Sequence, residues 1–242
     1  MAVPLVRHFA GLDARWAPPE KSDAAIIGSI AGQLPRGYGG VIVGIGKIRP
    51  DVDIDLSAAT VLGLRGELTL RGAGVRGDIA LGDTGLLAID LLGERPAVAH
   101  ALGVVPHYLD QSLAGRYPSA FRIDVGGDPL VVIRQIASCQ RIVSSSLHGL
   151  VTADSLGIAR MWEPYAELKG GRFKFDDYAS ALGIKLEPGG WDTAPQSAVA
   201  RARSALRDAM KELSAALSAP PKPAGRGRIS HLLRRRPRAG AR

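Results

Sequence analysis

The residues best suited to chemistry lie in the segment 141–163, RIVSSSLHGLVTADSLGIARMWE. A β-branched run is followed by three serines, a Leu-His-Gly tripeptide and an apolar stretch that ends at a glycine. This order is typical of a strand, a polar turn, a helix and a second strand in a parallel α/β domain. Ligands of such domains bind where a strand's carboxyl end meets the next helix. The residues at this junction, which would offer hydroxyls, helix amides and an imidazole to an anion, are Ser144, Ser145, Ser146 and His148, and Gly149 is a further candidate for substrate binding. A simpler interpretation is that the serines only cap the helix and His148 fills space.

Arg65 follows an apolar run at the expected start of a helix, in LGLRGELT. A guanidinium there could bind a carboxylate or phosphate through two hydrogen bonds. The alternative is a surface arginine paired with Glu67 or Asp83. Asp83 itself is expected to cap the helix that follows it.

Other cationic or nucleophilic residues are less specific. Lys47 ends the run VIVGIGK, where it would reach an anion or remain solvated. Lys169, Arg172 and Lys174 form a basic segment that suits a phosphate-bearing substrate, although charge runs more often form a solvated face. His107, in VVPHYLD, either lines a cleft or anchors the chain by a hydrogen bond. The single cysteine, Cys139, is expected to be a buried structural thiol.

Several common chemistries are not indicated. The chain has no G-x-G-x-x-G after a strand, and no Walker A, H-E-x-x-H or G-x-S-x-G motif. One cysteine allows neither an internal disulfide nor a multi-cysteine metal site. We therefore expect no metal and no cofactor.

Apolar runs, expected to be strands, alternate along the chain with amphipathic segments, expected to be helices. Expected strands lie at 24–30, 41–45, 57–64, 79–81, 98–105, 121–125, 141–144 and 158–162. Expected helices follow the strands at 57–64 and 79–81 and lie at 128–138, 147–156, 174–183 and 193–218, the last packing across both halves. Residues 1–23 show no clear periodicity. The α/β pattern predicts two Rossmann-like lobes, 1–110 and 111–219, joined by the polar stretch 110–119.

The net charge of +8 is located in the segment 220–242, whose eight Lys and Arg residues accompany no acid. We expect this segment to be a disordered basic tail, either solvated or docked on an anionic membrane surface. Specific nucleic-acid binding is not expected, because no aromatic platform accompanies the charge. Without a signal peptide or a long apolar segment, the protein is expected in the cytoplasm, where the tail could hold it at the inner face of the plasma membrane.

The segment SSSLHGLVTADSLGIA resembles the S-x-H-G-x-x-x-A-x-x-x-G-I-P stretch of the polysaccharide pyruvyl transferase family. Other segments agree with that family in order, over about residues 22 to 184: SDAAIIGSI, VIVGIGK, VLGLRGELT, LGDTGLLA, GVVPHYLD and FKFDDYASALGI. The resemblance implies two Rossmann-like lobes similar to the GT-B glycosyltransferases. It also implies phosphoenolpyruvate as the donor substrate, and a sugar of a cell-envelope polysaccharide or lipid-linked saccharide as the acceptor of a pyruvate ketal.

Carried over by position, the family's histidine falls on His148, its arginine on Arg65 and its lysine on Lys174, with Lys169 as the fallback. The imidazole would act as an acid or base, or bind phosphate as a cation. Residues 1–23 lack the family's N-x-G-D loop, so we expect the first lobe to be incomplete. Ala159 also replaces a usual proline. Two alternatives stay open: a nucleotide-sugar glycosyltransferase of similar fold, and a non-catalytic family descendant that acts as a binding protein.

Overall fold

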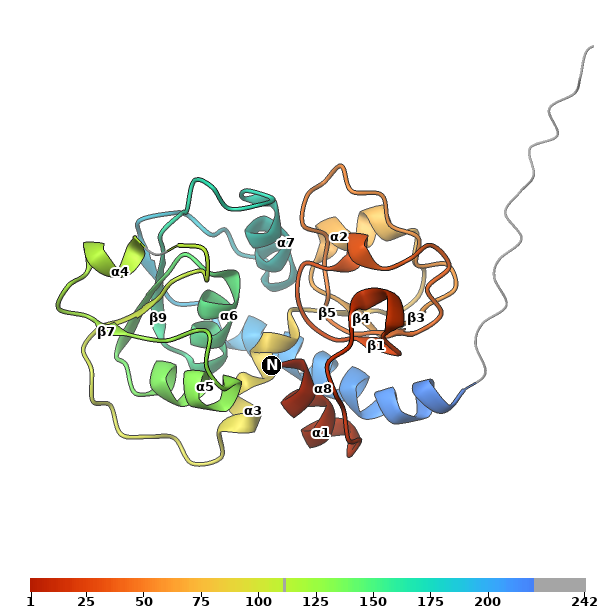
Figure 1. The fold of residues 1–242 in the computed structure, drawn as a ribbon, viewed down its shortest axis with the longest axis horizontal. Coiled ribbons are helices and arrows are strands. Elements are labelled where there is room, and N and C mark those ends of the chain that lie inside the picture. The colour runs from red at the N-terminus through yellow and green to blue at the C-terminus, as the bar shows by residue number, and fades with distance from the viewer. Residues whose placement is uncertain (111, 220–242) are drawn as a thin grey trace, which may run out of the picture.

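The apolar runs of the first part of the chain form a small parallel sheet in the computed structural model, which describes residues 1–110 and 112–219 (Figure 1). In this sheet β1 (Ala24–Ala25), β2 (Val41–Ile42) and β3 (Thr60–Val61) lie in that order, and β4 (Gly63–Leu64) pairs with β5 (Ala80–Leu81). A bridge between Ile45 and Leu64 joins the two groups. The expected strand at 24–30 is cut short because Gly28, at φ 107°, turns the chain out of the sheet.

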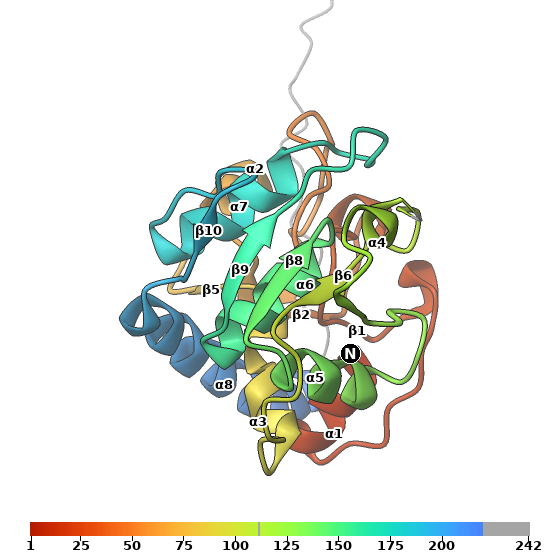
Figure 2. The same ribbon diagram turned by 90° about the vertical axis from the view of Figure 1, so that its left-hand side faces the viewer.

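The second lobe is a larger sheet, with strand order β10-β9-β8-β6-β7 (Figure 2). β6 (Gly103–Val105), β7 (Phe121–Arg122), β8 (Arg141–Ser144) and β9 (Ala159–Trp162) are parallel, whereas the edge strand β10 (Trp191–Asp192) is antiparallel. Its helices are α4 (Leu113–Arg116), α5 (Pro129–Ala137), α6 (Leu147–Leu156) and α7 (Phe173–Leu182). The α/β class is therefore confirmed.

Helix α6 is the central helix of the molecule. It spans 147–156, as the sequence predicts, and all its residues except His148 are buried. A helix that is apolar or small on every side must be covered on every side. α6 is covered by β8 and β9, by α3 (Ala88–Leu92) and α5, and by the short 3-10 helix η3 (Thr84–Leu87). His148 is the one position that opens to solvent, at the end nearest the first lobe.

Two terminal helices pack at the junction of the lobes. The long α8 (Gln196–Ser218) buries one face, including Val199, Leu206 and Leu213, and contacts η3, β5 and α7, so the expected packing across both lobes is confirmed. α1 (Ala2–Ala10) packs against α8. The sequence analysis missed α1 because the run AVPLVRHFA is short and contains a proline. The remaining turns, η1 (Pro19–Lys21) and η2 (Ala31–Gln33), precede and follow β1.

The change from one sheet to the other differs from the expected boundary at 110/111. β6 pairs with β7 and β8, so residues 103–105 belong to the second sheet. The stretch 110–119, expected between the lobes, instead connects β6 to β7 and contains α4. The chain crosses between β5 and β6, through η3 and α3. Strand partners far apart in sequence decide this boundary, and hydrophobic periodicity does not reveal them.

The basic tail 220–242 lies outside the described residues, and so do the expectations about membranes and nucleic acids that rest on it.

A fully buried ion pair joins the two lobes. Nε of Arg65, just after β4, donates to Oδ2 of Asp177 on α7 over 2.9 Å, and both side chains are inaccessible to solvent. Thr69 on α2 (Glu67–Ala73) supplies two further bonds to this carboxylate, from its backbone N–H at 2.8 Å and its hydroxyl at 2.7 Å. The other guanidinium nitrogens donate to Ser29 Oγ and to the carbonyl of Lys47. Every polar group of the pair is thus satisfied, which a buried ion pair requires.

Two glycines allow this close approach. A Cβ on Gly46 would lie 2.5 Å from Cζ of Arg65, and one on Gly66 would lie 1.7 Å from the backbone oxygen of Asp177. Neither position can carry a side chain without displacing the pair. Gly46 and Gly66 therefore allow α2 and α7 to pack closely at the lobe junction.

We predict that Asp177→Ala lowers the free energy of unfolding by about 3–5 kcal/mol, because it leaves the Arg65 guanidinium buried without a counter-charge. The neighbouring Asp176 is a matched control, since its ion pair with Arg172 is partly exposed. Asp176→Ala should cost about 1 kcal/mol or less. Urea denaturation of both variants measures the difference. Equal losses would show that the buried pair does not hold the lobes together.

Candidate functional site

A cavity of about 640 Å³ lies between the two lobes. Part of its wall comes from segments that follow strands in both sheets: Ile27, Ser29 and Ile30 after β1, Gly85 after β5, 106–109 after β6, 146–149 after β8 and 168–169 after β9. Met1 and the apolar side chains of α5 line the rest of it together with Lys174 and a few neighbouring residues. Because every strand except the edge strand β10 runs parallel to its sheet neighbours, the carboxyl ends of these strands open on the same space. This is the position at which α/β proteins bind ligands.

Three serines, the last residue of β8 and the two residues that follow it, tie the cavity wall together rather than capping the helix. Ser144 Oγ lies 2.7 Å from the carbonyl oxygen of Val105 and accepts the Ser146 N–H at 3.0 Å. Ser145, which is buried, accepts the His107 N–H on its Oγ at 2.9 Å. Ser146 is the N-cap residue of α6, yet its side chain makes no capping hydrogen bond. Ser146 lines the cavity, so the first turn of α6 faces the cavity without a side-chain cap from this serine.

Gly149 lets α6 approach the sheet at this turn. A Cβ there would lie 2.3 Å from Ser144 Oγ and 2.8 Å from Cγ1 of Val105. The glycine after His148 is therefore required by packing, and it also lines the cavity.

His148 projects from the first turn of α6 into the cavity, with its side chain 45% exposed. Its Nε2 lies 3.6 Å from Oδ2 of Asp83, a contact of an ion pair rather than of a hydrogen bond. Asp83 is fully buried, and its Oδ1 accepts the Gly85 N–H at 2.8 Å, which confirms the expected cap at the start of η3. In the described part of the chain, Oδ2 has no hydrogen-bond partner.

The charge of Asp83 is held in place by its neighbours. Burial would raise the pKa of this carboxyl, but the His148 imidazole, the Gly85 amide and the Arg65 guanidinium outweigh burial and keep the pKa below its ordinary value. An ionised carboxylate behind an imidazole favours the tautomer that carries its proton on the facing nitrogen, here Nε2. In that tautomer Nδ1 of His148 carries no hydrogen.

Lys174 brings a buried positive charge to the same cavity. Its side chain lies in the wall and is only 7% exposed. Among the described residues its Nζ has no hydrogen bond or carboxylate partner, and its nearest ring contact is with Phe175 at 5.4 Å. Burial, with a further contribution from Arg65, lowers its pKa to about 8. A buried ammonium group without a counter-charge is suited to binding an anion from solution.

His107 lies in the cavity wall contributed by the β6 loop. Its Nδ1 accepts the Leu109 N–H at 3.3 Å. Burial and the nearby Lys174 lower its pKa, an effect that Asp110 opposes and His148 reinforces. Both alternatives raised for His107 therefore hold, since its backbone anchors the loop and its ring lines the cavity.

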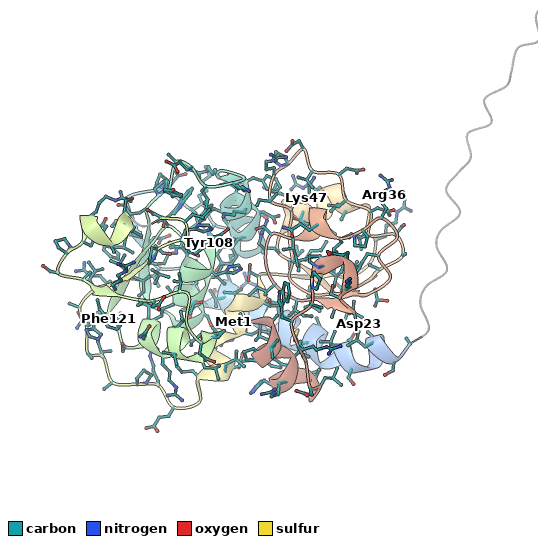
Figure 3. All side chains as sticks on the ribbon, in the orientation of Figure 1. Met1, Asp23, Arg36, Lys47, Tyr108 and Phe121 are labelled. Carbon is teal, nitrogen blue, oxygen red and sulfur yellow. The ribbon has the colours of Figure 1, made fainter. Side chains whose placement is uncertain are left out.

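Two of the expected anion-binding cations do not face the cavity. Arg65 is fully buried, with all three guanidinium nitrogens bonded within the lobe junction, and pairs with neither Glu67 nor Asp83. Lys47 is also buried, and its Nζ donates to the carbonyl of Pro50 at 2.6 Å. Figure 3 places Lys47 on the first lobe and Tyr108, which lines the cavity, on the second. Each cation is instead bound by oxygen acceptors of the protein itself, Arg65 across the lobe junction and Lys47 within the first lobe.

The remaining basic residues of the expected cluster diverge. Lys169 is exposed in the cavity wall. Arg172 instead pairs with Asp176 and Glu187 and lies 5.4 Å from the Trp162 ring. Helix α7 begins only at Phe173, so helical periodicity could not predict the relative directions of Lys169, Arg172 and Lys174.

Sequence reasoning missed Ser29, which lines the cavity and accepts a hydrogen bond from Nη1 of Arg65 at 2.6 Å. The signal available was the Gly28-Ser29 pair at the end of an apolar run. It also missed the contact between Asp83 and His148, for which no local signal exists.

Cys139 is buried, and burial raises the pKa of its thiol, as expected for a structural cysteine. In residues 1–110 and 112–219, no group of three or more His, Cys, Asp or Glu side chains is placed to hold a metal ion. Across the same residues, no helix has both the length and the apolar character to span a membrane.

Two curated proteins are similar to this chain. The uncharacterized protein L143 of Acanthamoeba polyphaga mimivirus is 36% identical over 120 residues, which are 45% of this chain and 42% of that protein. The succinoglycan biosynthesis protein ExoV of Rhizobium meliloti (strain 1021) is 27% identical over 168 residues, which are 64% of this chain and 51% of that protein. The chain thus spans about half the length of the curated relatives it matches. No family model and no solved structure matches, so the likeness to GT-B enzymes stays a prediction.

We predict that Lys174→Met raises the free energy of unfolding at pH 7 by about 1–3 kcal/mol, because it removes a charge whose burial lowers its pKa from 10.5 to about 8. Between pH 8 and pH 10.5 the unfolded chain binds more protons at this site than the folded chain does. The wild type should therefore gain stability as the pH rises from 8 to 10, and the advantage of the variant should shrink.

Urea denaturation at pH 7, 8, 9 and 10 measures this difference. Lys185→Met is the matched control, because Lys185 is an exposed lysine outside the cavity wall. A variant of Lys174 that was no more stable than the wild type at pH 7 would show that the ammonium group is not penalised by burial.

Proposed function

We propose that this chain binds phosphoenolpyruvate in the inter-lobe cavity and takes part in the transfer of its pyruvyl group to a saccharide of the cell envelope. The observation that carries the proposal is the buried, unpaired Lys174, which lies in the same cavity wall as His148 and the first turn of α6. The sequence similarity to a succinoglycan biosynthesis protein supports a role in making a polysaccharide. The resemblance of the His148 segment to pyruvyl transferases supports this donor.

The donor's charges match the groups in the cavity. Phosphoenolpyruvate carries a phosphate and a carboxylate. Lys174 would neutralise one of these groups, and the uncapped amides of α6 beside Ser146 would donate to the same group or the other. Because Lys174 has no carboxylate partner in the described residues, binding does not require an existing ion pair to break.

His148 would move the proton that the reaction requires. Ketal formation from phosphoenolpyruvate adds a proton to the methylene carbon, joins two sugar hydroxyl oxygens to C2 and releases phosphate. Asp83 would orient the imidazole through Nε2 and leave Nδ1 available, an arrangement suited to acid–base catalysis. The same imidazole, once protonated, would stabilise the departing phosphate.

Arg65 takes a different part from the one that the resemblance implies. Its guanidinium lies behind the wall, on Ser29 and Asp177. We propose that it positions the site, since Asp177 lies on α7 three residues after Lys174. The cavity between two parallel sheets is compatible with a GT-B-like architecture, and the acceptor would be a saccharide or a lipid-linked saccharide.

We predict that phosphoenolpyruvate binding at pH 8 is coupled to the uptake of about half a proton, because Lys174 is about half deprotonated at its pKa of about 8 and the bound anion would recharge it. Calorimetric titration in buffers of different ionisation enthalpy measures this uptake. Lys174→Met should lose it and bind at least about 10-fold more weakly. His148→Gln should lose phosphate release in the presence of an acceptor.

Lys185→Met controls for the loss of one positive charge and should bind as the wild type does. A folded wild type that binds a nucleotide-sugar and does not bind phosphoenolpyruvate would contradict the proposal and favour a glycosyltransferase. Binding of phosphoenolpyruvate that is unaffected by Lys174→Met would place the donor elsewhere.

A further inference from the structure

His107 is held more firmly than a surface histidine would be. Its backbone N–H donates to Ser145 Oγ at 2.9 Å, which ties the β6 loop to the β8–α6 junction. Three residues further on, buried Asp110 accepts the Ser112 hydroxyl at 2.8 Å and the Leu113 N–H at 3.2 Å, which fixes the end of the same loop. The ring therefore keeps its place in the cavity wall.

The ring's own hydrogen bond fixes its protonation. Because Nδ1 accepts the Leu109 N–H, the hydrogen of the neutral ring must lie on Nε2. Gaining a second proton would put two N–H groups against each other at Nδ1. His107 is thus a neutral ring with one donor, at Nε2, on the edge away from Leu109.

We infer that Nε2–H of His107 is a neutral hydrogen-bond donor to the anionic group that Lys174 and His148 bind in the cavity. This inference rests on the proposed function and adds a binding residue to it. The three side chains come from different elements, the β6 loop, α6 and α7, and all three line the same cavity.

The two histidines then have different tasks. His148 has a carboxylate, Asp83, 3.6 Å from its Nε2, and in the proposed function it acts as an acid or base. His107 has a backbone amide behind it and offers only a donor. Burial, Lys174 on α7 and His148 on α6 lower the pKa of His107, whereas Asp110 on its own loop raises it. A neutral donor adds selectivity for an oxyanion without adding repulsion to Lys174.

We test this with calorimetric titrations of phosphoenolpyruvate and, separately, of inorganic phosphate, into the wild type and two variants. His107→Ala removes the donor and should weaken binding by about 10- to 100-fold, as expected for a hydrogen bond to a charged group. His107→Gln keeps an N–H near the position of Nε2 and should stay within about 3-fold of the wild type. His8→Ala, an exposed histidine of α1 outside the cavity, is the control and should bind as the wild type does.

Nitrogen NMR of the unliganded protein, with His107 identified from the spectrum of His107→Gln, should show the Nε2–H tautomer at neutral pH. This readout does not depend on any ligand. The Nδ1–H tautomer or a charged ring would overturn the inference, and so would unchanged binding in a folded His107→Ala. Equal losses in the Ala and Gln variants would also overturn it, because a donor alone would then not suffice.

The two probes separate this inference from the proposed function. A wild type that binds phosphate but not phosphoenolpyruvate rejects the proposed donor, while the phosphate titrations still decide the role of His107. A wild type that binds neither anion rejects both.

Discussion

The arrangement of this molecule depends on one buried ion pair, between Arg65 at the end of the first sheet and Asp177 on α7 of the second lobe. The pair is fully desolvated, so it persists only because Thr69, Ser29 and the Lys47 carbonyl satisfy its remaining hydrogen-bonding groups. Any relative rotation of the lobes at this point would leave a buried charge unsatisfied. The ion pair therefore fixes the distance between the two sheets at the junction, and with it the width of the cavity.

The cavity gains its electrostatic character from the same constraint. α7 is anchored through Asp177, and the anchor holds Lys174, almost one helical turn earlier, where water reaches it poorly. Its charge is uncompensated because the two nearest acids on α7 have other partners: Asp176 pairs with Arg172 and Asp177 pairs with Arg65. Stability is thus given up at Lys174, a pattern expected of binding sites rather than of structural lysines.

The second lobe supplies a rigid frame for the polar groups. α6 is buried on all sides except at His148, and Gly149 allows it to lie directly on β6 and β8. A second buried charge cluster, Asp154 with Arg160 and Tyr178, fixes the far end of α6 to β9 and α7. Burial raises the pKa of Asp154 to about 6, against the opposing effect of Arg160. Both ends of the helix that carries His148 are therefore held, so the imidazole is directed by the fold and by Asp83.

The sequence by itself determined the α/β class, the unit from β8 to β9 with its limits at 141–144 and 147–156, and the grouping of serines and His148 at a strand end, because these follow from local periodicity. It also indicated Lys174 through a resemblance. Only the tertiary structure decided that β6 belongs to the second sheet, that Arg65 is buried in the lobe junction, that Asp83 lies beside His148, and that the ring of His107 lines the cavity. The physical reason is that burial and pairing of charged groups are set by partners that can lie more than a hundred residues away, as Asp177 does from Arg65.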